Sequence, residues 1–189
     1  MTSTLAHEEP VVSGISRRTF VAALAAAVPI LAAPRRLLAQ SASVRALSFT
    51  HTHTGERLAV EYFSAGTYLQ DALATVNHFL RDFRTDEVHA IDPALLDLLH
   101  GLTGLTRTMR PFQVISGYRS PATNEMLRHR SEGVAAGSLH MKGLAIDIRL
   151  ADVPLATLRK TALAIGRGGV GYYPASDFVH VDTGRVRTW

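Results

Sequence analysis

The chain has 189 residues, a formal net charge of +4 at neutral pH and no cysteine. Without cysteine it can have neither a disulfide framework nor a thiol that acts as a ligand or nucleophile. The charge is too small and too dispersed to indicate nucleic-acid binding, for which a basic stripe with interleaved aromatic residues would be expected.

Residues 1–42 have the pattern of a twin-arginine signal peptide. Arg17 and Arg18 precede an apolar run over 20–33, which has the length of a signal-peptide core and is short for a bilayer span. A buried core helix is the alternative, but a proline inside the run argues against it. Small residues at 39–42 offer a cleavage region. We therefore expect export to the periplasm or cell envelope by the twin-arginine machinery, and no stable membrane span after cleavage.

The remaining chain, residues 45–189, has the length of one domain. Removing the signal takes away four arginines and two glutamates, so the net charge falls from +4 to +2. No internal repeat, low-complexity segment or second hydrophobic span is visible in this part. We expect a single folded domain that acts as a monomer.

The first half of this domain has signals for two strands and two helices. Short β-prone runs at 47–53 and 57–62 predict a pair of strands. Apolar residues at helical spacing predict a helix over 68–83. Asp92 and Pro93 then have the pattern of an N-cap and first position for a leucine-rich helix.

The second half is richer in strands. Residues 112–116 indicate a buried strand, and Ser120 and Pro121 predict the start of a helix after it. Further strands are expected over 144–150, 168–173 and 178–183, with a helix over 153–165. Because helices come mostly in the N-terminal half and the late strands have short connections, we predict an α+β domain. Its sheet is expected to be small and largely antiparallel, and not doubly wound and parallel.

One segment offers two candidate metal ligands. His140 stands seven positions before Asp147, and apolar residues flank Asp147 in a predicted buried strand. A buried carboxylate needs a cation or several hydrogen bonds to stay ionised. Taken alone, however, a histidine and an aspartate at this spacing are more often a surface contact than a metal site.

His180 lies in another predicted strand, where alternation places Asp182 on the same face. This pair alone could equally be a core histidine held by its neighbouring carboxylate. Together the two segments provide two imidazoles and a carboxylate, the ligand set of a catalytic zinc ion with one position open for water. Arg119, at the end of a predicted strand, adds a third polar group.

Several motifs in order carry a resemblance to a known family. They are His53-Thr54-Gly55-Glu56, Arg81-Asp82-Phe83-Arg84, Ser116-Gly117-Tyr118-Arg119-Ser120-Pro121, Ser138-Leu139-His140-Met141 and His180-Val181-Asp182-Thr183-Gly184. With the Ser-x-His-x6-Asp and Asp-x-x-His spacings, they make residues 45–189 resemble the M15-type zinc peptidases. The match is closest to the exported murein endopeptidase branch of that family.

The resemblance implies that His140, Asp147 and His180 bind zinc. It also implies that Asp177, three residues before the last histidine, transfers protons between water and the leaving amine. Asp182 is the alternative, because strand alternation places it on the face of His180. Otherwise Asp182 would be a partner that orients this histidine.

Arg119 corresponds to the family arginine that holds substrate, and its planar fork could pair with a carboxylate or donate to a carbonyl oxygen. The alternative is a structural salt bridge. The implied reaction is zinc-dependent hydrolysis of amide bonds in peptidoglycan stem peptides or cross-links, in which the metal activates a water molecule. A carboxypeptidase acting on the same stems and a catalytically silent peptidoglycan-binding module are the alternatives.

Overall fold

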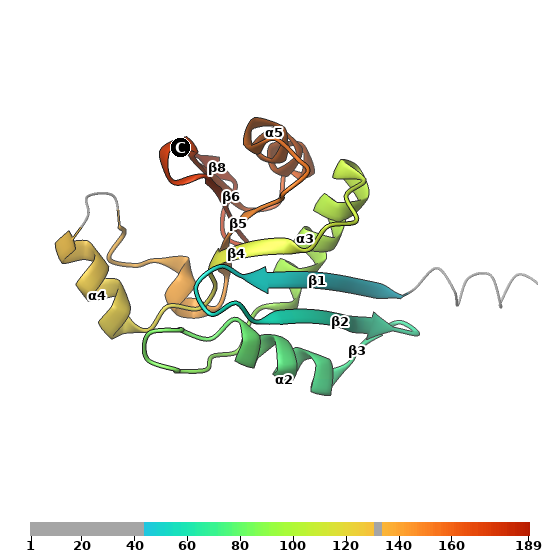
Figure 1. Ribbon diagram of the computed structural model, residues 1–189, viewed down its shortest axis with the longest axis horizontal. Coiled ribbons are helices and arrows are strands. Elements are labelled where there is room, and N and C mark those ends of the chain that lie inside the picture. The colour runs from blue at the N-terminus through green and yellow to red at the C-terminus, as the bar shows by residue number, and fades with distance from the viewer. Residues whose placement is uncertain (1–43, 131–133) are drawn as a thin grey trace, which may run out of the picture. The chain divides into compact units, whose positions relative to one another are not determined.

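The computed structural model describes residues 44–130 and 134–189, so the predicted signal peptide and part of the loop before Ser138 lie outside the described residues. Within them, the strands form one eight-stranded sheet in the order β3-β2-β1-β4-β5-β7-β6-β8. Figure 1 shows α2 running alongside β2, and α4 lying apart at one end of the strands.

The N-terminal part of the sheet is the predicted pair of strands with one short addition. Strand β1 (Arg45–His51) pairs antiparallel with β2 (Arg57–Ser64). Strand β2 pairs in turn with β3 (Thr67–Tyr68), whose two residues are too few to give a sequence pattern. The prediction of a strand pair here is confirmed.

Strand β4 (Phe112–Ser116) joins this part of the sheet to the rest. It pairs parallel with β1 and antiparallel with β5 (Ala145–Arg149). Next come β7 (Phe178–Asp182), β6 (Gly169–Tyr173) and β8 (Arg187–Thr188). In the described parts of the chain only the β1–β4 and β6–β8 pairings are parallel, so a largely antiparallel sheet is confirmed. With eight strands the sheet is larger than the sequence indicated.

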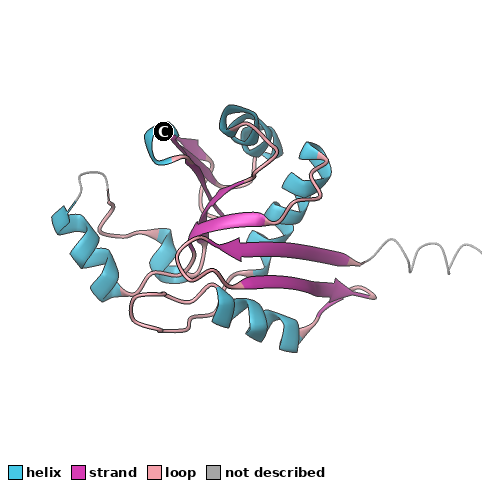
Figure 2. Cartoon of the chain, viewed as in Figure 1, coloured by secondary structure: helices cyan, strands magenta, loops and turns pink. Residues whose placement is uncertain are grey.

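Four α-helices accompany the described strands, and each was expected (Figure 2). They are α2 (Gln70–Phe79), α3 (Pro93–Thr106), α4 (Pro121–Arg130) and α5 (Leu155–Ile165). Two of them follow β4, so helices and strands are mixed more evenly along the chain than the sequence pattern indicated. Among the described residues, no helix is long and apolar enough to cross a membrane.

Helix α2 ends at Phe79, although its apolar pattern continues to residue 83. The carboxylate of Asp82 accepts hydrogen bonds from the backbone N–H groups of Arg84 and Ser120, at 3.0 and 2.8 Å. These bonds hold a turn that a continuing helix would not allow. The chain that follows the helix is thus fixed by a contact with a residue 38 positions away.

The core lies between the sheet and the helices that pack on it. Helix α3 contacts β1, and α5 contacts β6 and β7. The leucines expected in the core from the sequence are buried, among them Leu95, Leu96, Leu99 and Leu102. Strands β5 and β7 lie between other strands, and their apolar residues Ile146, Ile148, Val179 and Val181 have no exposed surface. These two strands are therefore firmly held.

Candidate metal centre

The pairing of β5 with β7 brings two candidate ligands together. Asp147 on β5 and His180 on β7 are direct cross-strand partners, and directly opposed side chains of an antiparallel pair lie close on one face. The Asp147 Oδ1 atom lies 2.9 Å from Nδ1 of His180. Backbone register alone is enough to create this contact.

His140 reaches the same point from the short 3-10 helix η1 (Leu139–Lys142), which ends at Gly143. Gly143 has a φ of +66°, and a Cβ atom there would lie 2.0 Å from the carbonyl oxygen of Ala90. Only glycine fits this turn. The His140 Nε2 atom lies 3.2 Å from Nδ1 of His180 and 3.3 Å from Oδ1 of Asp147.

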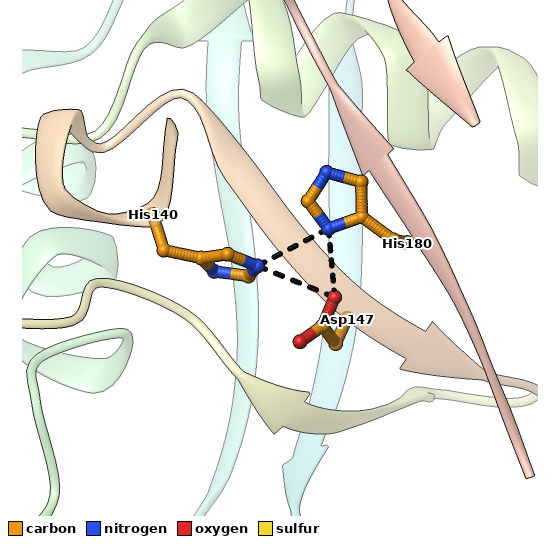
Figure 3. Close-up of side chains that lie close together, drawn as sticks. All are labelled: His140, Asp147 and His180. Carbon is orange, nitrogen blue, oxygen red and sulfur yellow. Dashed lines mark hydrogen bonds and ion pairs between the residues drawn. The ribbon is translucent and has the colours of Figure 1, made fainter. Parts of the chain in front are cut away.

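The three side chains point toward one another, as Figure 3 shows. Their potential ligand atoms all lie within 4.8 Å of one another, and all three residues are buried. Two imidazole nitrogens and one carboxylate oxygen suit zinc, and three protein ligands would leave a fourth position open. The donor set therefore fits the metal that the sequence predicts.

The far nitrogen of each imidazole has its own partner. His140 Nδ1 lies 2.7 Å from the carbonyl oxygen of Gly117, which can only accept, so Nδ1 donates the hydrogen. His180 Nε2 lies 3.0 Å from Oδ2 of Asp182 and donates to that carboxylate. Both rings thus direct the opposite nitrogen toward the cluster. Partners of this kind fix the tautomer and orientation of metal-binding histidines.

Asp182 is fully buried and its carboxylate is surrounded by donors. It accepts from the backbone N–H groups of Gly169 and Gly184 at 2.9 and 2.8 Å, and from the guanidinium of Arg187 at 3.1 and 2.8 Å. Burial raises the pKa of Asp182, but the hydrogen bonds from His180, Arg187 and the two amides outweigh it and hold the pKa well below its usual range. Asp182 is therefore ionised and fixed beside His180.

The cluster itself concentrates opposite charges. Burial raises the pKa of Asp147, but the charges and hydrogen bonds of His140 and His180 outweigh burial and lower the pKa. For His180, burial lowers the pKa, but hydrogen bonds to Asp147 and Asp182 raise it to about 9. In the absence of a metal, His180 is therefore protonated on both ring nitrogens. A metal ion would have to displace the proton on Nδ1, which faces Asp147.

Arg119 lies beside the cluster, just after β4. Its backbone N–H donates to the carbonyl oxygen of His140 at 3.3 Å, and its Nη2 lies 3.8 Å from Oδ2 of Asp147. Nη1 reaches Oδ1 of Asn124 at 3.4 Å, and the buried Nε has no hydrogen-bond partner in the described part of the chain. Arg119 also lines a cavity of about 600 Å³ together with the three candidate ligands. Arg119 is thus placed beside any molecule that occupies that cavity.

The structure does not bring Asp177 to this cluster. Asp177 follows the short helix η2 (Pro174–Ser176) with a φ of +53°, and its exposed carboxylate accepts from Nη1 of Arg149 at 2.9 Å. It lines a different, smaller pocket beside Gln113 and Arg149. The other predicted site residues lie together, namely His140, Asp147, His180, Arg119 and Asp182.

Two residues at the site were not expected from the sequence. Arg187 holds Asp182, and Trp189 lies with its ring centroid 5.2 Å from that of His180. A Cβ atom at Gly169 would lie 2.5 Å from the Arg187 guanidinium, and one at Gly171 would lie 2.7 Å from the Trp189 ring. Alternating glycines in a strand indicate a close approach by another group. That signal in Gly169-Val170-Gly171 could have pointed to both residues.

Comparison with known proteins agrees with the resemblance in the motifs. The family model described as "Peptidoglycan L,D-endopeptidase MepK" matches residues 39–189. A protein of Escherichia coli strain K12 named "Peptidoglycan L,D-endopeptidase MepK" is 50% identical over 145 residues, which cover 77% of this chain and 80% of the relative. A Haemophilus influenzae protein named "Probable peptidoglycan L,D-endopeptidase MepK" is 46% identical over 146 residues, covering 77% and 78%. The chain described here, with its buried histidine and aspartate cluster, belongs to the M15-type peptidase family Peptidase_M15_2.

Proposed function

We propose that this protein is a zinc peptidase that hydrolyses amide bonds in peptidoglycan stem peptides or cross-links. The observation that carries this proposal is the buried cluster of His140, Asp147 and His180 at the side of a cavity, in a chain of a peptidase family. The names of the relatives favour endopeptidase cleavage between an L-centred and a D-centred residue.

The metal would be held by Nε2 of His140, Nδ1 of His180 and a carboxylate oxygen of Asp147. Bound there, zinc would polarise the scissile carbonyl group and lower the pKa of a water molecule toward about 7. The Gly117 carbonyl and Asp182 maintain the imidazole tautomers that this binding requires. No cysteine or serine nucleophile is needed for this chemistry.

Arg119 binds substrate in this proposal. Its buried guanidinium lines the cavity and keeps one N–H group without a partner in the described chain. Stem peptides carry free carboxylates, which a planar guanidinium can bind through two parallel hydrogen bonds. The same group can donate to the substrate carbonyl oxygen as negative charge develops there.

The two aspartates considered for proton transfer differ in their surroundings. All the contacts of Asp182 hold it against His180, so we assign it the role of orienting that ligand. Asp177 can transfer a proton in the cavity only if its carboxylate leaves Arg149. These contacts support Asp182 as a positioning residue. Asp177 lies in a surface turn beside Arg149, outside the cavity of the cluster.

We also propose that residues 1–42 are a twin-arginine signal and that the peptidase domain, residues 45–189, acts as a monomer in the periplasm or cell envelope. The arginine pair and the apolar run that follows it support this location. Peptidoglycan, the substrate named for the relatives, requires the enzyme to work outside the cytoplasm.

The first prediction concerns the metal ligands. His140→Ala, Asp147→Ala and His180→Ala should each abolish hydrolysis and strongly reduce the zinc that the purified protein retains, because each removes one of three protein ligands. Zinc content would be measured by elemental analysis. The exposed His78 on α2 offers a matched control, and His78→Ala should retain zinc like the wild type. Normal zinc content in a cluster variant would remove that residue from the ligand set.

The second prediction separates the two aspartates. Asp182→Asn should weaken zinc affinity by about 10- to 100-fold, because it removes the acceptor that orients His180. Asp177→Asn should keep normal zinc affinity and near-normal turnover, since its partner Arg149 lies outside the cavity. Both variants would be assayed at saturating zinc as well as by zinc titration. A loss of about 10²-fold in turnover for Asp177→Asn with zinc bound would instead assign proton transfer to Asp177.

The third prediction concerns the reaction. Purified muropeptides with L,D cross-links should be converted to monomers, with the cut bond identified by mass spectrometry. Arg119→Lys should lower kcat/KM by about 10²-fold with zinc retained, because lysine lacks the planar fork. Arg128 on α4 pairs with Glu125 at the surface, so Arg128→Lys serves as the control. Release of a terminal residue alone would indicate a carboxypeptidase, and binding without turnover would indicate a silent module.

The fourth prediction concerns export. Replacing Arg17 and Arg18 together by lysine should leave the protein in the cytoplasm, because the twin-arginine machinery recognises the arginine pair. Cell fractionation with immunoblotting would show the location. A variant that still reaches the periplasm would indicate another secretion route.

A further inference from the structure

Aromatic side chains form one wall of the cavity beside the candidate metal centre. Tyr173 at the end of β6 stacks on Phe178 at the start of β7, with ring centroids 4.5 Å apart. Trp189, after β8, lies next to His180. All three line the cavity that Arg119 also lines. The wall therefore borders both the ligand cluster and the arginine expected to bind substrate.

Hydrogen bonding within this wall leaves one hydrogen free. The Trp189 Nε1 atom lies 2.7 Å from the phenol oxygen of Tyr173. An indole N–H can only donate, so the phenol oxygen is the acceptor in this bond. The hydrogen of the Tyr173 hydroxyl then has no acceptor within residues 44–130 and 134–189. A half-buried phenol at a cavity thus keeps its donor available for a bound molecule.

The described residues that line the cavity offer no acidic side chain outside the ligand cluster. Among the described residues that line it, the single side-chain carboxylate is that of Asp147, which belongs to the ligand cluster. Hydrolysis of an amide places negative charge on the carbonyl oxygen in the transition state. A fixed neutral donor aimed at that oxygen is an effective way to stabilise the charge.

We propose that Tyr173 is a catalytic residue whose hydroxyl donates a hydrogen bond to the substrate carbonyl oxygen, and that Trp189 positions it. This inference rests on the peptidase function proposed above. Trp189 acts through Tyr173 because its N–H fixes the phenol oxygen as an acceptor and so directs the phenol hydrogen elsewhere. Gly171 permits the arrangement, since a Cβ atom there would lie 2.7 Å from the indole ring.

Tyr173→Phe tests the proposal, because it removes the hydroxyl and keeps the ring that stacks on Phe178. With cross-linked muropeptides as substrate, kcat should fall by about 10²-fold while KM and zinc content stay near the wild-type values. Tyr172→Phe is the matched control. The Tyr172 ring packs beneath the Arg159 guanidinium at 5.0 Å and does not line the cavity, so kcat should be unchanged.

Trp189→Phe tests the positioning role, because it removes the N–H donor and keeps an aromatic ring. Its kcat should fall by less than that of Tyr173→Phe. In the Tyr173→Phe background the same change should cause no further loss, since residues that act through one group are not additive. Additive losses would show that Trp189 acts independently of the phenol and would overturn the positioning role.

A second readout does not depend on activity. Trp189 is the single tryptophan of the chain, so fluorescence excited at the long-wavelength edge of the absorption band, where the five tyrosines do not absorb, reports on it alone. Tyr173→Phe removes the acceptor of the indole N–H and should shift the emission maximum, whereas Tyr172→Phe should not. An unchanged emission in Tyr173→Phe would show that the hydrogen bond does not form and would overturn the proposal.

The kinetic outcomes separate this inference from the function on which it rests. If the wild type cleaves cross-links and Tyr173→Phe retains its kcat, the catalytic role of Tyr173 is wrong and the peptidase function stands. If the zinc-loaded wild type cleaves no muropeptide, both are wrong.

Discussion

The antiparallel register of β5 and β7 is the constraint on which the rest of the site depends. It places Asp147 opposite His180, so two of the three candidate ligands meet through backbone pairing alone. Two residues further along β7, the same register puts Asp182 on the face of His180, where their side chains form a hydrogen bond. A shift of β7 by one residue would turn His180 and Asp182 to the other face, away from Asp147.

The apolar face of the same strands protects this register. Ile146, Ile148, Val179 and Val181 are fully buried, so a slip would expose them and bury polar groups in their place. Burial of the polar face has a different effect, because few water molecules can screen the charges of Asp147, Asp182 and Arg119 there. Each of these charges has a partner of opposite sign, and the site can therefore be polar and rigid at once.

Local patterns in the sequence predicted the strands of the site and the faces that their residues occupy. Alternation correctly placed Asp182 beside His180, and the Asp92-Pro93 pattern predicted the start of α3, where the Asp92 side chain accepts from the N–H of Ala94. Features that depend on distant contacts were not predictable in this way. The position of Asp177 follows from a left-handed turn and a bond to Arg149, and Trp189 reaches the site through the parallel pairing of a two-residue strand with β6.

The loop that carries Arg119 and the turn that carries His140 hold each other by two reciprocal bonds. The Gly117 carbonyl accepts from the His140 ring, and the backbone N–H of Arg119 donates to the carbonyl of His140. The residue proposed to bind substrate and a proposed metal ligand are therefore held together. A substitution that changes substrate preference through this loop would therefore also disturb the turn that carries His140.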